Sequence, residues 1–211
     1  MTKRNDDAQL PQNQGGHRED RTGFEIDATT RPLDTRMHIR QAISSDASAI
    51  ARVHVDSWRT TYEGIVPESY LASLSYEERA ARWKRTLENP EGFFVFVAEV
   101  SKEIVGFVSG GRDRSNDQEY TGELRAIYIL DPYRRKGIGK QLVSAVVRKL
   151  QEQGHSSMLV WVLAQNPHRR FYEEKLGGEF LRSKPIEIGG AKYEEFAYGW
   201  KDLGALLLRL R

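Results

Sequence analysis

The chain has 211 residues, of which 39% are apolar, and its 32 basic and 30 acidic residues nearly cancel. This size fits one domain with a tail, and the balanced charge argues against a nucleic acid or an anionic membrane as a partner. The chain has no cysteine, which excludes disulfides, thiolate metal sites and an acyl-cysteine intermediate.

The first 36 residues differ in composition from the rest. They are polar and carry few large apolar side chains, so they cannot bury enough surface to offset the entropy of ordering. They also lack the apolar core of a signal peptide, and no stretch of the chain approaches the roughly 20 apolar residues of a membrane span. We therefore expect a disordered, dispensable tail over residues 1–36 and a cytoplasmic protein without membrane contact.

A chain that starts at Met37 is expected to keep its melting temperature, because a polar tail offers the core little apolar area. Two origins of the tail stay open: a mis-assigned start or expression remnant, and a real segment that regulates or docks. Thermal unfolding of the two chain lengths, compared side by side, is the measurement. Aggregation of the shorter chain, or a loss of several degrees, would show that the tail packs on the domain.

From Met37 onwards, segments of alternating and of helical periodicity follow one another. In chain order, the pattern predicts a strand over 38–43; helices over about 47–62, from Pro67 to about Ser73, and over Glu77–Leu87; strands over Phe93–Val100, Ile104–Gly110 and Glu123–Leu130; a helix over Gly137–Gln153; a strand over Ser157–Ala164; a short helix over Pro167–Leu176; strands over Phe180–Ile188 and Lys192–Trp200; and a closing helix over Leu203–Leu210. This order predicts an α/β fold, with a mixed sheet of about six to seven strands flanked by helices. The domain is expected at 37–203, followed by a C-terminal helix at 204–211.

A basic turn with two glycines, residues 131–140, links the strand at Glu123–Leu130 to the long helix. Free N–H groups and the dipole at a helix start attract an anion, and glycines let it approach closely. The turn lacks the Walker pattern and does not continue into the Rossmann Gly-x-Gly-x-x-Gly pattern. It predicts a diphosphate site of another kind, and a solvated basic turn is the alternative.

The block from Glu123 to Gly139 resembles the acetyl-CoA segment of GNAT acyltransferases, and Val160–Ala164, Asn166 and Phe171-Tyr172 resemble the next block. The resemblance covers about Met37 to Leu203 and is strongest over 123–177. It implies a GNAT-type fold, in which the strands at 123–130 and 157–164 splay apart and the pantetheine arm lies between them. It implies that acetyl-CoA, as co-substrate, is held by the main chain at Ile127, Tyr128 and Ile129, by Arg134, Arg135, Lys136, Gly137, Ile138, Gly139 and Lys140, and by Asn166.

The same resemblance implies Glu123 as general base and Tyr172 as general acid of a direct transfer. An ordinary glutamate is a poor base for an alkylammonium, so Glu123 would have to be desolvated or to work through a water chain. A phenol is reasonably matched to a thiolate leaving group. The structural alternatives are a surface glutamate beside a loop and an aromatic core residue.

The segment after the second block departs from the family. Asn166 and Pro167 form a geometric N-cap and N1 pair, and the resemblance leaves the Asn166 amide nitrogen for the pantetheine. Gly177 follows Tyr172 one residue later than usual, and His168 stands where a small residue is common. We expect the extra residue to rotate the end of this helix.

The substrate side is expected on the first helices. Residues 57–67 resemble a subgroup of bacterial GNAT enzymes whose amine substrates vary. Trp58 and Tyr62 lie four apart on one helical face, so they are candidates to wall an amine pocket, with core packing as the alternative. The five histidines show no metal-ligand spacing, and no metal is predicted.

Together these features predict an N-acetyltransferase that moves an acetyl group from acetyl-CoA to a primary amine of a small molecule, by direct transfer in a ternary complex. Two alternatives stay open: a peptide or protein amine as acceptor, and a non-catalytic acyl-CoA sensor. The presence of both Glu123 and Tyr172 argues against the sensor. The sequence does not name the amine, and it leaves a homodimer open.

Overall fold

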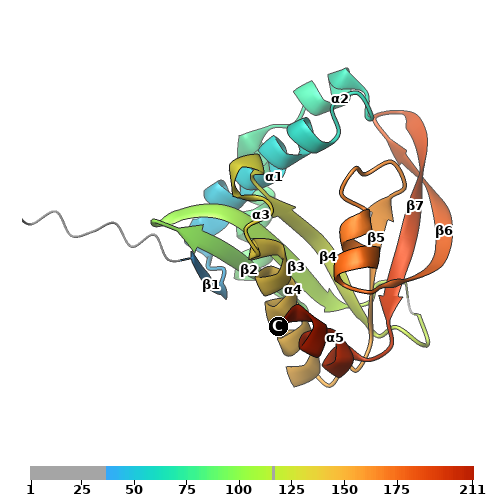
Figure 1. Ribbon diagram of the computed structural model, residues 1–211. Helices are drawn as coiled ribbons and strands as arrows, with labels where there is room; N and C mark the ends of the chain where they lie inside the picture. The colour runs from blue at the N-terminus through green and yellow to red at the C-terminus, as the bar shows by residue number, and fades with distance from the viewer. Residues whose placement is uncertain (1–36, 116) are drawn as a thin grey trace, which may run out of the picture. The chain divides into compact units, whose positions relative to one another are not determined.

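The computed structural model describes residues 37–115 and 117–211, so the tail expected over residues 1–36 lies outside the described residues. A mixed sheet with the strand order β1-β2-β3-β4-β5-β7-β6 organises the described part (Figure 1). Its strands are β1 (Met37–Gln41), β2 (Phe93–Val100), β3 (Glu103–Arg112), β4 (Gly122–Ile129), β5 (Met158–Leu163), β6 (Glu179–Ile188) and β7 (Ala191–Trp200). The α-helices are α1 (Ala47–Thr61), α2 (Glu68–Ala72), α3 (Tyr76–Glu88), α4 (Ile138–Glu152) and α5 (Leu203–Leu210). The predicted α/β class is confirmed. Within the described residues, no helix has the length and apolar character needed to cross a membrane.

Both faces of the sheet are covered, because successive side chains of a strand point to opposite sides. On β2, Phe94 and Ala98 pack in the cluster that contains α4 and α5. Val95 and Val97, between them, pack in the cluster that contains α1 and Trp83 of α3. Figure 1 shows this division, with α4 and α5 on one side of the sheet and α1 and α3 on the other.

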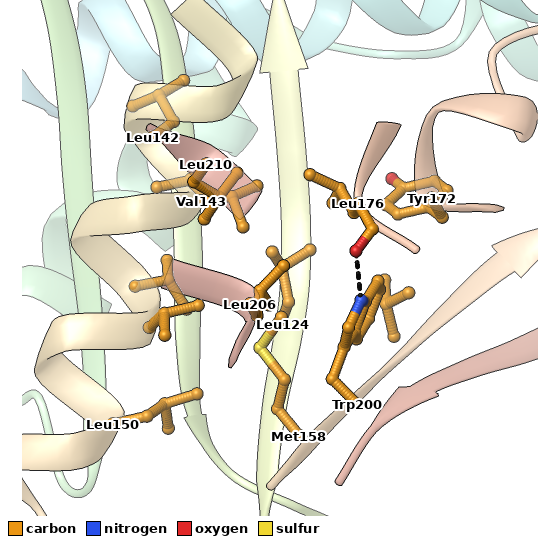
Figure 2. Packing of buried hydrophobic residues seen from close by; sticks show 14 of the residues in the cluster. Leu124, Leu142, Val143, Leu150, Met158, Tyr172, Leu176, Trp200, Leu206 and Leu210 are labelled. Atoms are coloured by element: carbon orange, nitrogen blue, oxygen red, sulfur yellow. Dashed lines mark hydrogen bonds between the residues drawn. The ribbon is translucent and has the colours of Figure 1, made fainter. Parts of the chain in front are cut away.

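The last helix, α5, covers part of the same face of the sheet as α4. Leu206 and Leu210 of α5 pack in one buried cluster with Leu142 and Leu150 of α4 (Figure 2). In the same cluster, the indole Nε1 of Trp200 donates a hydrogen bond of 2.9 Å to the backbone oxygen of Leu176. The last helix therefore belongs to the same core as the strands before it.

Trp200→Phe is expected to lower the free energy of unfolding by about 1–3 kcal/mol, because it leaves the buried oxygen of Leu176 without its donor. Chemical denaturation of the two proteins is the measurement. Trp161→Phe, at a half-buried position of β5, is the matched control and should cost less. Equal losses in the two variants would contradict the role of the hydrogen bond.

β4 and β5 run parallel and soon separate. In the described chain their pairing extends only from Gly122↔Met158 to Leu124↔Val160. On its other side, β4 pairs with β3 along its whole length, with a register shift beside Leu124 that leaves Arg125 as a bulge residue. The edge of β4 that faces β5 is thus free of sheet pairing from Arg125 onwards, which confirms the splayed strands.

A third buried cluster closes the far end of this gap. It joins Tyr62 and Leu71, from the α1–α2 region, to Leu163 of β5 and Ile188 at the tip of the β6–β7 hairpin. The Tyr193 hydroxyl of β7 donates to the backbone oxygen of Ile65 at 3.0 Å. Figure 1 shows α2 beside this hairpin tip.

The segment predicted as a short helix over Pro167–Leu176 is instead a turn followed by a π-helix, Phe171–Lys175. The Leu176 N–H donates to the Phe171 oxygen, five residues back, at 3.1 Å. A π-helical turn holds one residue more than an α-turn, which is the extra residue before Gly177. Arg209 of α5 donates to the Lys175 and Glu174 carbonyls at 3.1 Å, so the helix adapts locally and its end stays anchored.

Candidate active site

A cavity of about 570 Å³ lies where β4 and β5 separate. This volume is within the range of about 300–1,000 Å³ that is usual for ligand pockets. Ten of the predicted site residues line it: Ile127, Tyr128, Ile129, Arg134, Arg135, Gly137, Gly139, Lys140, Asn166 and Tyr172. Residues from two chain segments about thirty apart in sequence therefore meet around one hollow, as the resemblance implied.

The glycine turn presents the start of α4 to this cavity. Gly137 is the N-cap of α4 with a φ of 83°, a left-handed conformation that suits glycine. The first backbone N–H groups of the helix have no partner within the helix and are available to an anion. A Cβ at Gly139 would lie 3.2 Å from the Phe171 ring, so glycine here lets the turn approach the π-helix closely.

Arg134 is committed to holding the turn. Its guanidinium donates to the Ile129 oxygen at 3.1 Å, to Thr61 Oγ1 at 2.9 Å and to His168 Nε2 at 2.6 Å, and it pairs with Asp131 at 2.8 Å. Burial, and then the charge of Arg134, lower the pKa of His168, so its ring stays neutral and accepts this hydrogen bond. Arg134 therefore ties the turn to β4 and α1.

Two predicted coenzyme residues do not line the cavity. Ile138 is buried in the core below the turn. The Lys136 ammonium lies over the Tyr133 ring, 5.3 Å from its centroid. Sequence reasoning missed seven lining residues, Thr61, Pro167, His168, Arg170, Phe171, Glu174 and Lys175. Most of them lie in or directly after the second block that resembles GNAT enzymes, the block that contains Asn166 and Phe171-Tyr172. This position in the sequence was the signal that could have identified them.

Asn166 caps the turn as predicted, and its contact with the pantetheine stays a prediction. Its Oδ1 accepts from the His168 backbone N–H at 2.8 Å and so caps the turn. Its Nδ2 donates to the Tyr62 hydroxyl at 3.0 Å. Because an amide nitrogen carries two hydrogens, one donor is left for a ligand.

Tyr172 is both a core residue and a cavity residue. It packs in the α4-side cluster, its ring stacks on Tyr198 at a centroid distance of 6.2 Å, and it lines the cavity. Burial, and then the proximity of Tyr128, raise the pKa of the Tyr172 phenol. The hydroxyl thus keeps its proton near neutral pH and is available as a donor.

Trp58 and Tyr62 stand behind the cavity wall, and neither lines the cavity. Their rings lie 4.7 Å apart in the third cluster. The Trp58 Nε1 donates to the Tyr128 hydroxyl at 2.9 Å, and Tyr62 accepts from Asn166. Each thus positions a residue that does line the cavity, and direct contact with an amine stays a prediction.

Glu123 lines a separate cavity of about 350 Å³. Only 3% of it is exposed, so the interpretation of a surface glutamate is wrong. Arg114, whose side chain is 65% exposed, donates two hydrogen bonds of 2.6 and 2.8 Å to its carboxylate. Arg125 lies on its other side, with Nε 3.6 Å from Oε2. No feature of the sequence indicated that Glu123 pairs with Arg114.

Within residues 37–115 and 117–211, no three or more His, Cys, Asp or Glu side chains lie close enough together to hold a metal ion. His54, on α1, is packed between aromatic rings. It stacks on Tyr128 at 4.9 Å, and burial lowers its pKa to about 3, so it is neutral.

Known proteins match this chain over most of its length. A family model described as the acetyltransferase (GNAT) family matches residues 52–177. The uncharacterized N-acetyltransferase YuaI of Bacillus subtilis (strain 168) is 44% identical over 170 residues, which cover 80% of this chain and 95% of YuaI.

Two solved structures share the fold. PaiA N-acetyltransferase from Thermoplasma acidophilum, in complex with coenzyme A, is 22% identical with a TM-score of 0.57, and the match covers 76% of this chain and 98% of PaiA. YncA from Salmonella typhimurium, with its cofactor acetyl-CoA, is 22% identical with a TM-score of 0.61, and the match covers 80% of this chain and 94% of YncA. The chain belongs to the GNAT family of N-acetyltransferases and is an acyltransferase enzyme.

Proposed function

We propose that this enzyme moves the acetyl group of acetyl-CoA onto the primary amine of a small molecule, by direct transfer in a ternary complex. One observation carries the proposal: the free edge of β4 and the glycine turn line the same cavity. The free edge suits the amides of a pantetheine arm, and the helix start suits a diphosphate. The coenzyme A and acetyl-CoA complexes of PaiA and YncA support this assignment.

The cations of the cavity divide between two tasks in this proposal. Arg134 holds the turn, whereas Arg135 and Lys140 face the diphosphate. Arg170 and Lys175, on the opposite wall, add positive charge from the π-helical segment. Attraction between these groups and phosphate oxygens is strong because both partners are charged.

The transfer breaks one bond and forms one. The amine nitrogen attacks the thioester carbonyl carbon, the carbon–sulfur bond breaks, and the sulfur leaves as a thiolate. Glu123 takes the proton that the ammonium loses before the neutral amine attacks, and Tyr172 gives its proton to the sulfur. The nitrogen releases a second proton as the amide forms, and this proton restores the Tyr172 phenol. Because Glu123 lines a different cavity from Tyr172, the ammonium proton reaches Glu123 through water, or the exposed Arg114 side chain first moves aside.

A library of primary amines, incubated with protein and acetyl-CoA, tests the proposal through release of the free thiol. Lysine-containing peptides form the second arm, and acetylation of peptides alone would favour a protein acceptor. Two-substrate kinetics with the best amine should give intersecting lines. Parallel lines would contradict a ternary complex, and acetyl-CoA binding without transfer to any amine would favour a sensor.

A further inference from the structure

A second hollow on the α1–α3 face of the sheet is rich in arginine. Its volume is about 390 Å³, and Arg79, Arg82, Trp83 and Thr86 line it from one side of α3. Their spacing of i, i+3, i+4 and i+7 places them on one helical face. Arg125, the bulge residue of β4, lines it from the sheet, together with His54, Asn89, Glu91 and Phe93.

The positive charge of this hollow is only partly compensated. Arg79 and Arg82 make no side-chain ion pair or hydrogen bond within residues 37–115 and 117–211, whereas Arg52, on the neighbouring α1, pairs with Glu103 at 2.9 Å. Three guanidinium groups line the hollow with one carboxylate, the exposed Glu91, and Arg125 also pairs with Glu123, outside the hollow, at 3.6 Å. His54 is neutral and adds no charge.

Arg125 is the buried member of this group. Its side chain is 18% exposed, it lies over the Phe93 ring, and its Nη2 donates to the Arg112 oxygen at 2.8 Å. Its Nε is buried and has no hydrogen-bond partner. Burial lowers its pKa, as expected for a cation that lacks solvent. The Glu123 carboxylate offsets part of this cost from one side, and a second oxyanion on the α3 side would offset more.

The hollow adjoins both halves of the reaction site. Arg125 also lines the cavity of Glu123, so one guanidinium borders the two hollows. On the other side, His54 stacks on Tyr128, which lines the coenzyme cavity. Burial lowers the pKa of His54, and the nearby positive charge of Arg79 lowers it further. Burial raises the pKa of Tyr128, and the charge of Arg79 opposes this rise.

We propose that the hollow formed by Arg79, Arg82 and Arg125 binds an oxyanion group of the acceptor, so that the acceptor is a small amine that also carries a carboxylate or a phosphate-type group. This inference rests on the proposed transfer and adds the substrate class to it. The ammonium end of the acceptor lies on the Glu123 side of Arg125, and the anionic end lies on the α3 side. Arginine suits the anionic end because its planar group binds such oxyanions through two hydrogen bonds.

Four probes of similar length separate the charges: n-butylamine, putrescine, 4-aminobutyrate and 3-aminopropylphosphonate. We expect kcat/KM to be highest for one of the two anionic probes. The double variant Arg79→Gln/Arg82→Gln should lower kcat/KM for the anionic probes by roughly 10- to 100-fold and leave n-butylamine unchanged, since charged hydrogen bonds are lost only with the former. Arg85→Gln, on the same helix and outside the hollow, is the matched control.

Calorimetric titration of 4-aminobutyrate into the protein with coenzyme A gives a readout that does not depend on turnover. Tighter binding than n-butylamine, lost in the double variant and partly kept in Arg79→Lys/Arg82→Lys, supports the inference. Tighter binding of 3-aminopropylphosphonate than of 4-aminobutyrate would identify the anionic group of the acceptor as a phosphate-type group. Equal binding of 4-aminobutyrate and n-butylamine, or equal losses for both in the double variant, would overturn it. A protein that does not bind acetyl-CoA would instead contradict the proposed function. Separate titrations with acetyl-CoA and with the amine probes distinguish this result from a failure of the oxyanion site.

Discussion

Gly137→Asp is expected to abolish acetyl-CoA binding in a protein that still folds. A Cβ at Gly137 would meet no heavy atom within 4 Å, so the substitution adds no clash within the protein. It places a carboxylate at the helix start, where the diphosphate is proposed to lie. At an effective dielectric of about 20, two like charges about 4 Å apart repel by roughly 4 kcal/mol, which corresponds to a loss of about 100- to 1,000-fold in affinity.

Gly137→Asn separates charge from backbone strain. Asparagine has nearly the shape of aspartate, and both tolerate the left-handed φ of 83° better than most residues. Calorimetric titration with acetyl-CoA should therefore show a modest loss for asparagine and a near-complete loss for aspartate. Circular dichroism and the melting temperature check that both variants fold. An aspartate variant that binds as tightly as the wild type would remove the turn from the coenzyme site.

Tyr172→Phe is expected to lower kcat by roughly 100-fold, the lower end of the usual effect of a general acid. The phenylalanine keeps the ring that packs against Tyr198 and removes only the hydroxyl of this cavity-lining residue. Acetyl-CoA affinity should stay within about twofold of the wild type, because the proton is given up only as the carbon–sulfur bond breaks. Steady-state kinetics and calorimetry together make this measurement.

Tyr198→Phe is the matched control for this variant. Its hydroxyl is bound to Arg169 and Glu173, both at 2.6 Å, and it does not line the coenzyme cavity. Tyr198→Phe should lower the free energy of unfolding without a large change in kcat. An unchanged kcat in Tyr172→Phe, or equal losses in both tyrosine variants, would count against Tyr172 as the acid.

Local signals predicted the fold well because they depend on neighbours in the chain. The nearly continuous apolar run in Phe93–Val100 is typical of a strand covered on both faces, and both faces are covered. The two glycines at the start of α4 indicated a left-handed cap and a close approach, and Gly137 and Gly139 provide the first and the second of these. A strand, a glycine turn and a helix in this order, together with the family resemblance, predict an anion site, which stays a prediction.

Membership of the cavities depended on tertiary structure. Lys136 and Ile138 belong to the same turn as Arg135 and Gly137, yet one lies over Tyr133 and the other points into the core. Which residues of a tight turn face a ligand depends on the path of the backbone, and a run of basic letters does not encode it. The aromatic pair on α1 shows the same limit, because helical spacing identifies a face without saying what covers it.

The sequence by itself determined the order of elements, the family and the position of the glycine turn that we propose for the coenzyme, since each depends on contiguous residues. Only the tertiary structure decided the environment of Glu123, the π-helical turn and the arginine hollow. Glu123 is buried against Arg114 because a loop folds back over β4, and the bulge at Arg125 turns a buried guanidinium toward α3. These features arise from contacts between distant segments. Ion pairs and cavities of this kind form from side chains that no local pattern connects.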